Sequence, residues 1–427
     1  MADREFALET LCLHAGQVPD AATGSRAMPL YQTSAYVFDS AEHASSLFNL
    51  QTFGNIYTRL SNPTTAAFEE RMAALEGGRA AVATASGMAA EMTAILTLLE
   101  SGDHIVAAKS LYGGTHTLLT VNLPKLGIDC TLVDADDPSA FEAAITDKTR
   151  LVYAEALGNP GINVLDIAAI ADVAHAAGVP LMIDATFATP YLCRPIEHGA
   201  DIVVHSATKY ICGHGTSIGG VIVESGKFPY DNGKFPCMTD PSPGYHGVRF
   251  YETFGDFGYT MKARCEMLRT FGACVSPFNA WTFLQGLETL HVRMDRHVEN
   301  AMKVAKFLES HERVSWVNYP ALEGNRYYDL AQRYYPKGPG AILSFGIKGG
   351  TVAGEKFIEA ATFMSHLANV GDAKTLIVHP ASTTHRQLSE EEQLASGVSP
   401  DLIRVSVGIE SADDIVWDID QALAASA

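Results

Sequence analysis

The sequence predicts an α/β fold: a central, mostly parallel sheet with helices on both faces, followed by a smaller C-terminal α+β domain. Short runs rich in Val, Ile and Leu recur along the chain, and helical stretches such as 166–177 separate several of them. Strands that are apolar throughout are typical of parallel sheets buried on both faces. The runs are residues 104–108, 130–133, 151–156, 180–186, 201–206 and 219–224.

The bulk composition excludes several classes of partner. The chain has 427 residues and a formal net charge of −19, which disfavours nucleic acid and anionic lipid surfaces. No apolar run approaches the roughly 18 residues of a membrane span, and the opening MADREFALET has no apolar core. We therefore expect a cytoplasmic protein that acts on small molecules and binds neither nucleic acid nor membranes.

The cysteines indicate a reducing compartment. There are 7 of them, irregularly spaced and without a Cys-x-x-Cys pair. This pattern argues against a disulfide framework and against a zinc site. We expect no metal.

The chain divides into an arm and two domains. Residues 1–60 carry little regular pattern, and such a long irregular arm is unusual in a compact domain. We expect the arm to wrap a partner subunit or to contribute to a site. The βα alternation then places a large domain over 61–264 and a smaller one over 265–427.

Residues that typically begin or end helices, and segments rich in Gly and Pro, predict individual elements of the chain. Pro63 can open a helix after Asn62, and Gly77 can end it. Residues 225–255 are rich in Gly, Pro and aromatic side chains and indicate a long loop insertion. Residues 277–311 predict a long helical stretch.

One lysine follows a predicted buried strand, in the sequence Ser206-Ala-Thr-Lys209. Burial of an ammonium group is costly, and a desolvated lysine becomes a nucleophile toward aldehydes. The alternative is a surface lysine at a strand end. Serine β-lactamases also contain Ser-x-x-Lys, but their Ser-Asp-Asn and Lys-Thr-Gly sequences are absent here.

Two other residues lie at the ends of predicted strands. Asp184 ends the strand at 180–186, at the sheet edge where ligands of α/β proteins bind. A carboxylate there can pair with a protonated pyridine nitrogen, unless it is a helix N-cap or an internal ion-pair member. Tyr112 follows the strand at 104–108 and could stack on a flat ring or serve only in packing.

Two further features suit anions. Ser86-Gly87-Met88 opens a predicted helix, and a glycine at a helix N-terminus lets a phosphate approach the backbone. The alternative is an ordinary loop glycine. Arg404 lies in an otherwise apolar strand, where a guanidinium requires a carboxylate, from a ligand or from an internal salt bridge.

These residues stand in motifs through which the whole chain resembles the Cys/Met-metabolism family of pyridoxal 5'-phosphate (PLP) enzymes. The motifs are DIVVHSATKYICGHG, YTRLSNPT, ASGMAA, LYGGTH, GNP, MIDATFATPYLCRP and HPASTTH. The resemblance implies a fold-type I PLP-dependent transferase with PLP as its cofactor. Lys209 would then carry the cofactor as a Schiff base and act as the mobile base, Tyr112 would stack on the ring and assist, and Asp184 would pair with the pyridine nitrogen.

The same resemblance implies the remaining contacts. The phosphate would lie in a cup formed by Ser86, Gly87, Met88, Ser206 and Thr208. Asn159 would contact the cofactor, and Arg404 would bind the substrate carboxylate, with Asn369 the next candidate. Tyr57 and Arg59 would reach the phosphate of a neighbouring subunit, with Tyr57 also bordering its substrate. We therefore expect a homo-oligomer with shared active sites, a tetramer built of dimers.

Within the family, the insertion at 225–255 resembles the branch that replaces the acetate of O-acetyl-L-homoserine by sulfide or a small thiol. The products are homocysteine or methionine, and acetate, so the enzyme would be a transferase of methionine biosynthesis. Asn369-Val-Gly371 stands where γ-lyases have Ser-Leu-Gly, which weakens a lyase assignment. Cystathionine γ-synthesis, γ-elimination from methionine or cystathionine, a succinyl donor and a non-catalytic scaffold stay open as alternatives.

Overall fold

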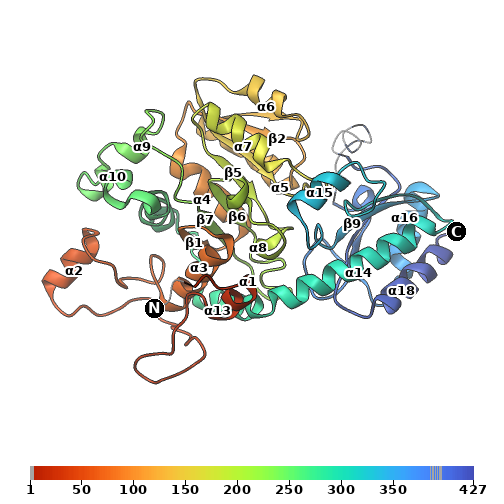
Figure 1. The fold of residues 1–427 in the computed structure, drawn as a ribbon, viewed down its shortest axis with the longest axis horizontal. Coiled ribbons are helices and arrows are strands. Elements are labelled where there is room, and N and C mark those ends of the chain that lie inside the picture. The colour runs from red at the N-terminus through yellow and green to blue at the C-terminus, as the bar shows by residue number, and fades with distance from the viewer. Residues whose placement is uncertain (1–3, 385, 387–388, 390, 392, 394–396) are drawn as a thin grey trace.

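The computed structural model describes residues 4–384, 386, 389, 391, 393 and 397–427, which fold around two sheets (Figure 1). Among these residues, seven strands form a large sheet in the order β1-β7-β6-β5-β4-β2-β3. Only β7 runs antiparallel to its neighbours, β1 and β6. The strands are β1 Ala80–Thr84, β2 His104–Ala108, β3 Asp129–Val133, β4 Thr149–Glu155, β5 Leu181–Asp184, β6 Ile202–His205 and β7 Gly220–Glu224.

The prediction of a central, mostly parallel sheet with helices on both faces is confirmed. Each of the six predicted apolar runs forms a strand. The sequence prediction missed β1, whose five residues, AAVAT, are mostly alanine and lack the β-branched density of the other runs. β1 is a strand because its backbone pairs with β7 over its whole length.

Helices α3 (Pro63–Glu76) and α4 (Gly87–Leu98) pack against the large sheet, α3 on β1 and β7 and α4 on β6 and β7. As predicted, α3 begins after Asn62, whose side chain accepts a hydrogen bond from Thr64 N at 2.9 Å, and it ends at Gly77, where φ is 69°. The other helices along this sheet are α5 Gly113–Thr117, α6 Pro138–Ala144, α7 Ile167–Ala176 and α8 Thr189–Leu192.

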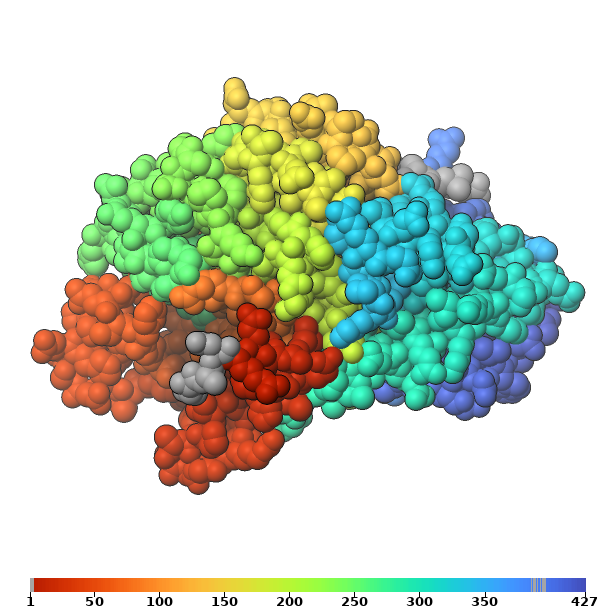
Figure 2. Space-filling model, viewed as in Figure 1, coloured from red at the N-terminus to blue at the C-terminus, as the bar shows by residue number. Residues whose placement is uncertain are grey.

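Residues 1–60 are less irregular than predicted, because they contain the helices α1 (Leu8–His14) and α2 (Ala41–Phe48). The buried Cys12 lets α1 pack onto α3 and α13 of the same chain. The later part of the arm, with α2, stands out from the body of the molecule (Figures 1 and 2). Its role toward a neighbouring subunit stays a prediction.

The insertion at 225–255 is also partly helical. It contains α9 (Pro236–Thr239) and α10 (Phe250–Phe254) and leads into α11 (Gly258–Lys262) and α12 (Arg269–Phe271). Buried aromatic rings join it to the main hydrophobic core, and Tyr230 contacts Phe228, Phe235 and Tyr259 there.

The second part of the chain builds a small sheet. Within the described residues its strand order is β10-β11-β12-β9-β8. The strands are β8 Val314–Asn318, β9 Ile342–Ile347, β10 Ser365–His366, β11 Leu376–Val378 and β12 Leu402–Ser406. The helices are α13 Pro277–Glu288, α14 Leu290–Ser310, α15 Tyr328–Tyr334, α16 Gly350–Ala360 and α18 Ala412–Ala425.

The helical stretch predicted over 277–311 is two helices that meet at Thr289. The first, α13, packs with α3 beside the large sheet, and the second, α14, continues to the small sheet (Figure 1). The domain boundary between 264 and 265 stays a prediction. No helix within the described part of the chain is long and apolar enough to cross a membrane.

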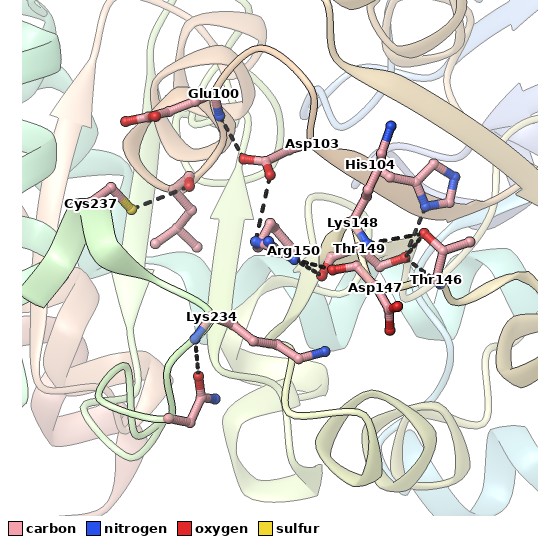
Figure 3. Close-up of polar contacts among 12 residues, drawn as sticks. Glu100, Asp103, His104, Thr146, Asp147, Lys148, Thr149, Arg150, Lys234 and Cys237 are labelled. Carbon is pink, nitrogen blue, oxygen red and sulfur yellow. Dashed lines mark hydrogen bonds and ion pairs between the residues drawn. The ribbon is translucent and has the colours of Figure 1, made fainter.

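The starts of β2 and β4 lie at what we call the amino edge of the large sheet (Figure 3). Asp103 accepts a hydrogen bond from Glu100 N at 2.8 Å and lies 3.5 Å from Arg150 Nε. His104 contacts Thr149 and Thr131, each at 2.9 Å. The side chains of Asp103, His104 and Arg150 thus have partners within the chain, and the residues predicted from strand ends lie at the opposite, carboxyl edge.

Candidate active site

The carboxyl edge of the large sheet gathers the residues predicted from strand ends. β2, β4, β5 and β6 are parallel, so their last residues meet at one edge. Asp184 ends β5, Tyr112 follows β2, and Lys209 follows β6. Strand β12 of the small sheet contributes Arg404.

Lys209 is half-buried and points at a residue distant in sequence. Its Nζ donates a hydrogen bond to Asn369 Oδ1 at 2.5 Å. Burial, and next the nearby positive charge of Arg404, lower the pKa of Lys209. Among the described residues no carboxylate forms an ion pair with this ammonium group, so the alternative of an ordinary surface lysine is disfavoured.

Arg404 lies in β12 between β9 and β11. Its guanidinium donates to Asn159 Oδ1 at 3.1 Å, and burial lowers the pKa of Arg404 to about 10. The ion pairs found in the described part of the chain do not include it, which disfavours the internal salt bridge that the sequence left open. A guanidinium that donates to only one amide oxygen keeps its other N–H donors for the carboxylate of a ligand.

A cradle for an anion lies where α4 begins. Ser86 caps this helix, its Oγ accepting from Ala89 N at 3.1 Å. Gly87 lies directly against Ser206, because a Cβ on Gly87 would come within 2.7 Å of Ser206 Cβ. Thr208 is held beside them by hydrogen bonds to Gly219. Only glycine permits this approach, and the first-turn N–H groups of α4, Met88 included, suit a phosphate.

Asp184 belongs to a group of buried acids. Its Oδ1 accepts from Thr186 N at 2.8 Å, and it lies beside Glu155, its register partner in β4. Burial and the charge of Asp184 raise the pKa of Glu155 well above its ordinary value, and the same two causes raise the pKa of Glu91, on α4, to about 8. Burial also raises the pKa of Asp184, so a cation placed against it would be strongly stabilised.

Sequence reasoning missed Glu155 and Glu91. Glu155 carries the same signal that identified Asp184, since it is an acid that ends an apolar strand. Glu91 lies within a helix, and its position in the chain gives no comparable signal. Only the packing of α4 on the sheet places it near Asp184.

Tyr112 presents its side chain to the mouth of the site, and 51% of the residue's surface is exposed. A Cβ on Gly114 would lie 2.5 Å from Tyr112 Cε1 and 3.1 Å from Met88 Sδ, so the ring and the start of α4 are neighbours. An exposed aromatic ring beside an anion cradle is suited to stacking on a flat ligand.

Tyr57 and Arg59 are not joined to this group. The Arg59 guanidinium lies 5.0 Å from the centre of the Tyr57 ring, and both residues belong to the arm. Arg59 Nε is buried and has no hydrogen-bond partner among the described residues. The structure therefore brings together all the predicted site residues except these two.

The segment at 379–385, predicted as a family motif, lies after β11. Both ring nitrogens of His379 are hydrogen-bonded, to Ser382 Oγ at 2.8 Å and to Pro400 O at 2.9 Å, so this histidine is a structural residue. His385 lies outside the described residues.

Comparisons with known proteins give a family and several similar proteins. The model of the family described as "Cys/Met metabolism PLP-dependent enzyme" matches residues 9–424. O-acetyl-L-homoserine sulfhydrylase of Leptospira meyeri is 55% identical over 429 residues, covering 98% of this chain and 97% of that protein. Homocysteine synthase of Schizosaccharomyces pombe is 55% identical over 418 residues, covering 97% of each.

A solved structure is also similar to this chain. The crystal structure of a putative O-acetylhomoserine (thiol)-lyase from Campylobacter jejuni has a TM-score of 0.95 and 40% sequence identity, over 98% of this chain and 100% of that one. That structure contains N'-pyridoxyl-lysine-5'-monophosphate at one lysine position.

Proposed function

Since this chain belongs to the Cys/Met metabolism family of PLP-dependent enzymes, we propose that it replaces the acetate of O-acetyl-L-homoserine by sulfide, or by a small thiol. The products are L-homocysteine, or methionine, and acetate. The observation that carries the proposal is its 55% identity, over 98% of the chain, to a protein named O-acetyl-L-homoserine sulfhydrylase.

The residues at the carboxyl edge fit PLP. Lys209 offers a half-buried amino group without a carboxylate partner in the described residues, and the cradle at Gly87 and Ser206 is closed to any side chain. A protonated ring nitrogen is the cation that would hold Asp184 ionised despite its burial. We propose that Lys209 would hold the cofactor covalently, with Asp184 at its ring nitrogen and Tyr112 on its ring.

The phosphate would take its donors from the start of α4 and from the turn after β6. These residues are Ser86, Gly87, Met88, Ser206 and Thr208. Asn159 would contact the cofactor, and its side-chain oxygen accepts a hydrogen bond from the Arg404 guanidinium. Arg404 would then bind the substrate α-carboxylate by two parallel hydrogen bonds, in an orientation that Asn159 sets.

When bound, PLP supplies the electron sink that makes hydrogens on the substrate carbons acidic. Lys209 Nζ is the mobile base that would take the Cα proton and then a Cβ proton, and Asn369 Oδ1 orients it between transfers. Tyr112 would assist these transfers. At Cγ the C–O bond to acetate breaks and a C–S bond to the nucleophile forms, while Arg404 keeps the substrate in register.

Steady-state kinetics with acyl-homoserines and sulfur nucleophiles test this proposal. We expect the highest kcat/KM with O-acetyl-L-homoserine and sulfide, and equal amounts of homocysteine and acetate. A preference for cysteine as nucleophile would indicate cystathionine γ-synthesis, and α-ketobutyrate and ammonia from methionine alone would indicate a γ-lyase. A protein that binds PLP and converts none of these substrates would overturn the proposal.

We also propose that the arm completes the site of a second copy, in a tetramer built of dimers. The unpartnered Nε of Arg59 and the exposed side of Tyr57 support this proposal. A cavity of about 840 Å³ lies between the arm, α3 and residues 257–269. On this proposal the arm is 1–60, the PLP-binding domain 61–264 and the C-terminal domain 265–427.

Mixing inactive subunits tests the shared site. Arg59→Ala and Lys209→Ala chains should each be inactive or nearly so, and together they should recover activity, because one hybrid site keeps both wild-type groups. Absence of recovery, with subunit exchange verified by mass spectrometry, would contradict the proposal. We also propose a cytoplasmic location for the protein, because of the net charge of the chain and the pattern of its cysteines.

A further inference from the structure

Glu155 is a buried acid at the carboxyl edge with no part in the proposed chemistry. It is the last residue of β4, only 6% exposed, and its strand neighbour is Asp184. A second carboxyl group beside an aspartate that must be ionised is unfavourable, because each negative charge opposes the other. An apolar residue would suit the strand end better, unless the carboxyl group has a task.

Its contacts indicate that task. Glu155 Oε1 accepts a hydrogen bond from the backbone N–H of Tyr112 at 2.5 Å. The backbone N–H groups of Tyr112 and Asn159 both favour its ionised form. One carboxyl group therefore reaches two backbone positions whose side chains serve the proposed site, Tyr112 toward the ring and Asn159 toward Arg404.

The Tyr112 segment depends on such anchors. Its side chain is half exposed, so packing alone does not hold the ring, and the short helix α5 begins directly after it, at Gly113. A second buried acid holds the other end of this turn, since both carboxylate oxygens of Glu91 accept from Thr115 Oγ1, at 2.9 and 3.0 Å. Rigid placement of an exposed aromatic ring requires fixing of its backbone.

We infer that Glu155 is a positioning residue, which fixes the Tyr112 backbone so that its ring meets the cofactor and which holds Asn159 in line with Arg404. This inference rests on the proposed function for its consequences in catalysis. Its structural part concerns one hydrogen bond, which exists whether or not the reaction is assigned correctly.

Three substitutions of Glu155 test separately the acceptor oxygen, the carboxyl group and the length of the side chain. Glu155→Gln keeps an acceptor oxygen at nearly the same place, Glu155→Met removes it, and Glu155→Asp keeps the carboxyl group but withdraws it from Tyr112 N. The matched control is Glu224, a buried strand-end glutamate of β7 that likewise accepts from two backbone N–H groups, those of Tyr259 and Thr260. It lies at the amino edge, so Glu224→Met removes the same kind of bond away from the site.

The first measurement is hydrogen exchange at the Tyr112 amide, made without cofactor or substrate. Glu155→Met and Glu155→Asp should accelerate this exchange by roughly tenfold, because the amide loses its side-chain acceptor, whereas Glu155→Gln and Glu224→Met should leave it nearly unchanged. If Glu155→Met does not fold, Glu155→Asp gives the same comparison. Unchanged Tyr112 protection in Glu155→Asp overturns the inference.

The second measurement uses the PLP-loaded enzyme. Glu155→Met and Glu155→Asp should shift the visible band of the bound cofactor and lower kcat roughly tenfold or more, with a smaller change in KM, because a misplaced group costs rate more than binding. Glu224→Met should keep the spectrum and kcat. If the wild type lacks the proposed activity but loss of Tyr112 protection is still seen, only the function is wrong. If Glu224→Met lowers kcat as much, Glu155 is merely structural and the inference fails.

Discussion

At the amino edge of the large sheet, Asp103 is paired with Arg150 and accepts a backbone hydrogen bond (Figure 3). At the carboxyl edge, Lys209 donates to the amide oxygen of Asn369 and Arg404 to that of Asn159. No carboxylate among the described residues pairs with either side chain. The difference is that Asp103 and Arg150 are paired within the chain, whereas Lys209 and Arg404 keep donors for a ligand.

Burial also shifts the pKa values of the residues at the carboxyl edge. Burial lowers the pKa of Lys209 and of Arg404 and raises that of Asp184. Such shifts mean that the folded chain holds charge where it is unfavourable, which is typical of functional sites. A ligand with a phosphate, a protonated ring nitrogen and a carboxylate would offset all of them.

The largest expected effect is that of Lys209→Ala. Borohydride reduction of the PLP-loaded wild type should fix the cofactor on the peptide that contains Lys209, and the variant should show no such adduct. Without the base, activity should fall by about 10²–10⁴-fold or more. Lys148→Ala at the amino edge is the control and should retain the adduct and the activity. Recovery of the adduct on another peptide would contradict the assignment.

Glu91→Gln should change how stability depends on pH. The folded-state pKa of Glu91, about 8, lies above the ordinary 4.5, so the folded chain keeps a proton that the unfolded chain has lost, and stability falls as the pH rises between these values. Glutamine removes this loss. The free energy of unfolding of the variant, relative to wild type, should therefore rise by about 1.4 kcal/mol per pH unit in that window.

Urea unfolding across the window measures this slope. Glu224→Gln sharpens the comparison, because the pKa of Glu224 is about 7 and its slope should end there rather than near 8. A difference between Glu91→Gln and wild type that does not change with pH would show that Glu91 is ionised in the folded chain.

Arg404→Lys should lower kcat/KM by roughly tenfold or more, because lysine keeps the charge but cannot form two parallel bonds to the substrate carboxylate. The spectrum of the bound cofactor should not change. Arg150→Lys, which alters an arginine of the amino edge, should leave the kinetics as they are. Weaker cofactor binding or lower stability of Arg404→Lys, with an unchanged KM, would assign Arg404 to structure and point to Asn369 for the carboxylate.

The smallest effect is expected for Asp103→Asn. Its ion pair with Arg150 is partly exposed, with side chains 19% and 21% accessible, so its loss should cost no more than about 1 kcal/mol of unfolding free energy. The kinetic constants should stay the same. A fall in kcat/KM without loss of stability would mean that the amino edge takes part in function, and the comparison of the two edges would fail.

Prediction from sequence succeeded where a signal is local. Asn62, Pro63 and Gly77 marked the ends of α3, and apolar runs marked six of the strands of the large sheet. It failed where contacts with distant parts of the chain determine the local structure. β1 is a strand because β7 pairs with it. The helix predicted over 277–311 breaks at Thr289, and its two halves pack near different sheets.

By itself, the sequence determined the strand ends, and with them the places of Lys209 and Asp184, because apolar runs and the residues that end them are neighbours in the chain. Its motifs determined the family. Only the tertiary structure decided which groups meet across long separations: Lys209 with Asn369, Arg404 with Asn159, and Glu155 with Tyr112. The physical reason is that a hydrogen bond depends on atoms within about 3 Å, and only the packing of the strands and of the two sheets sets that distance.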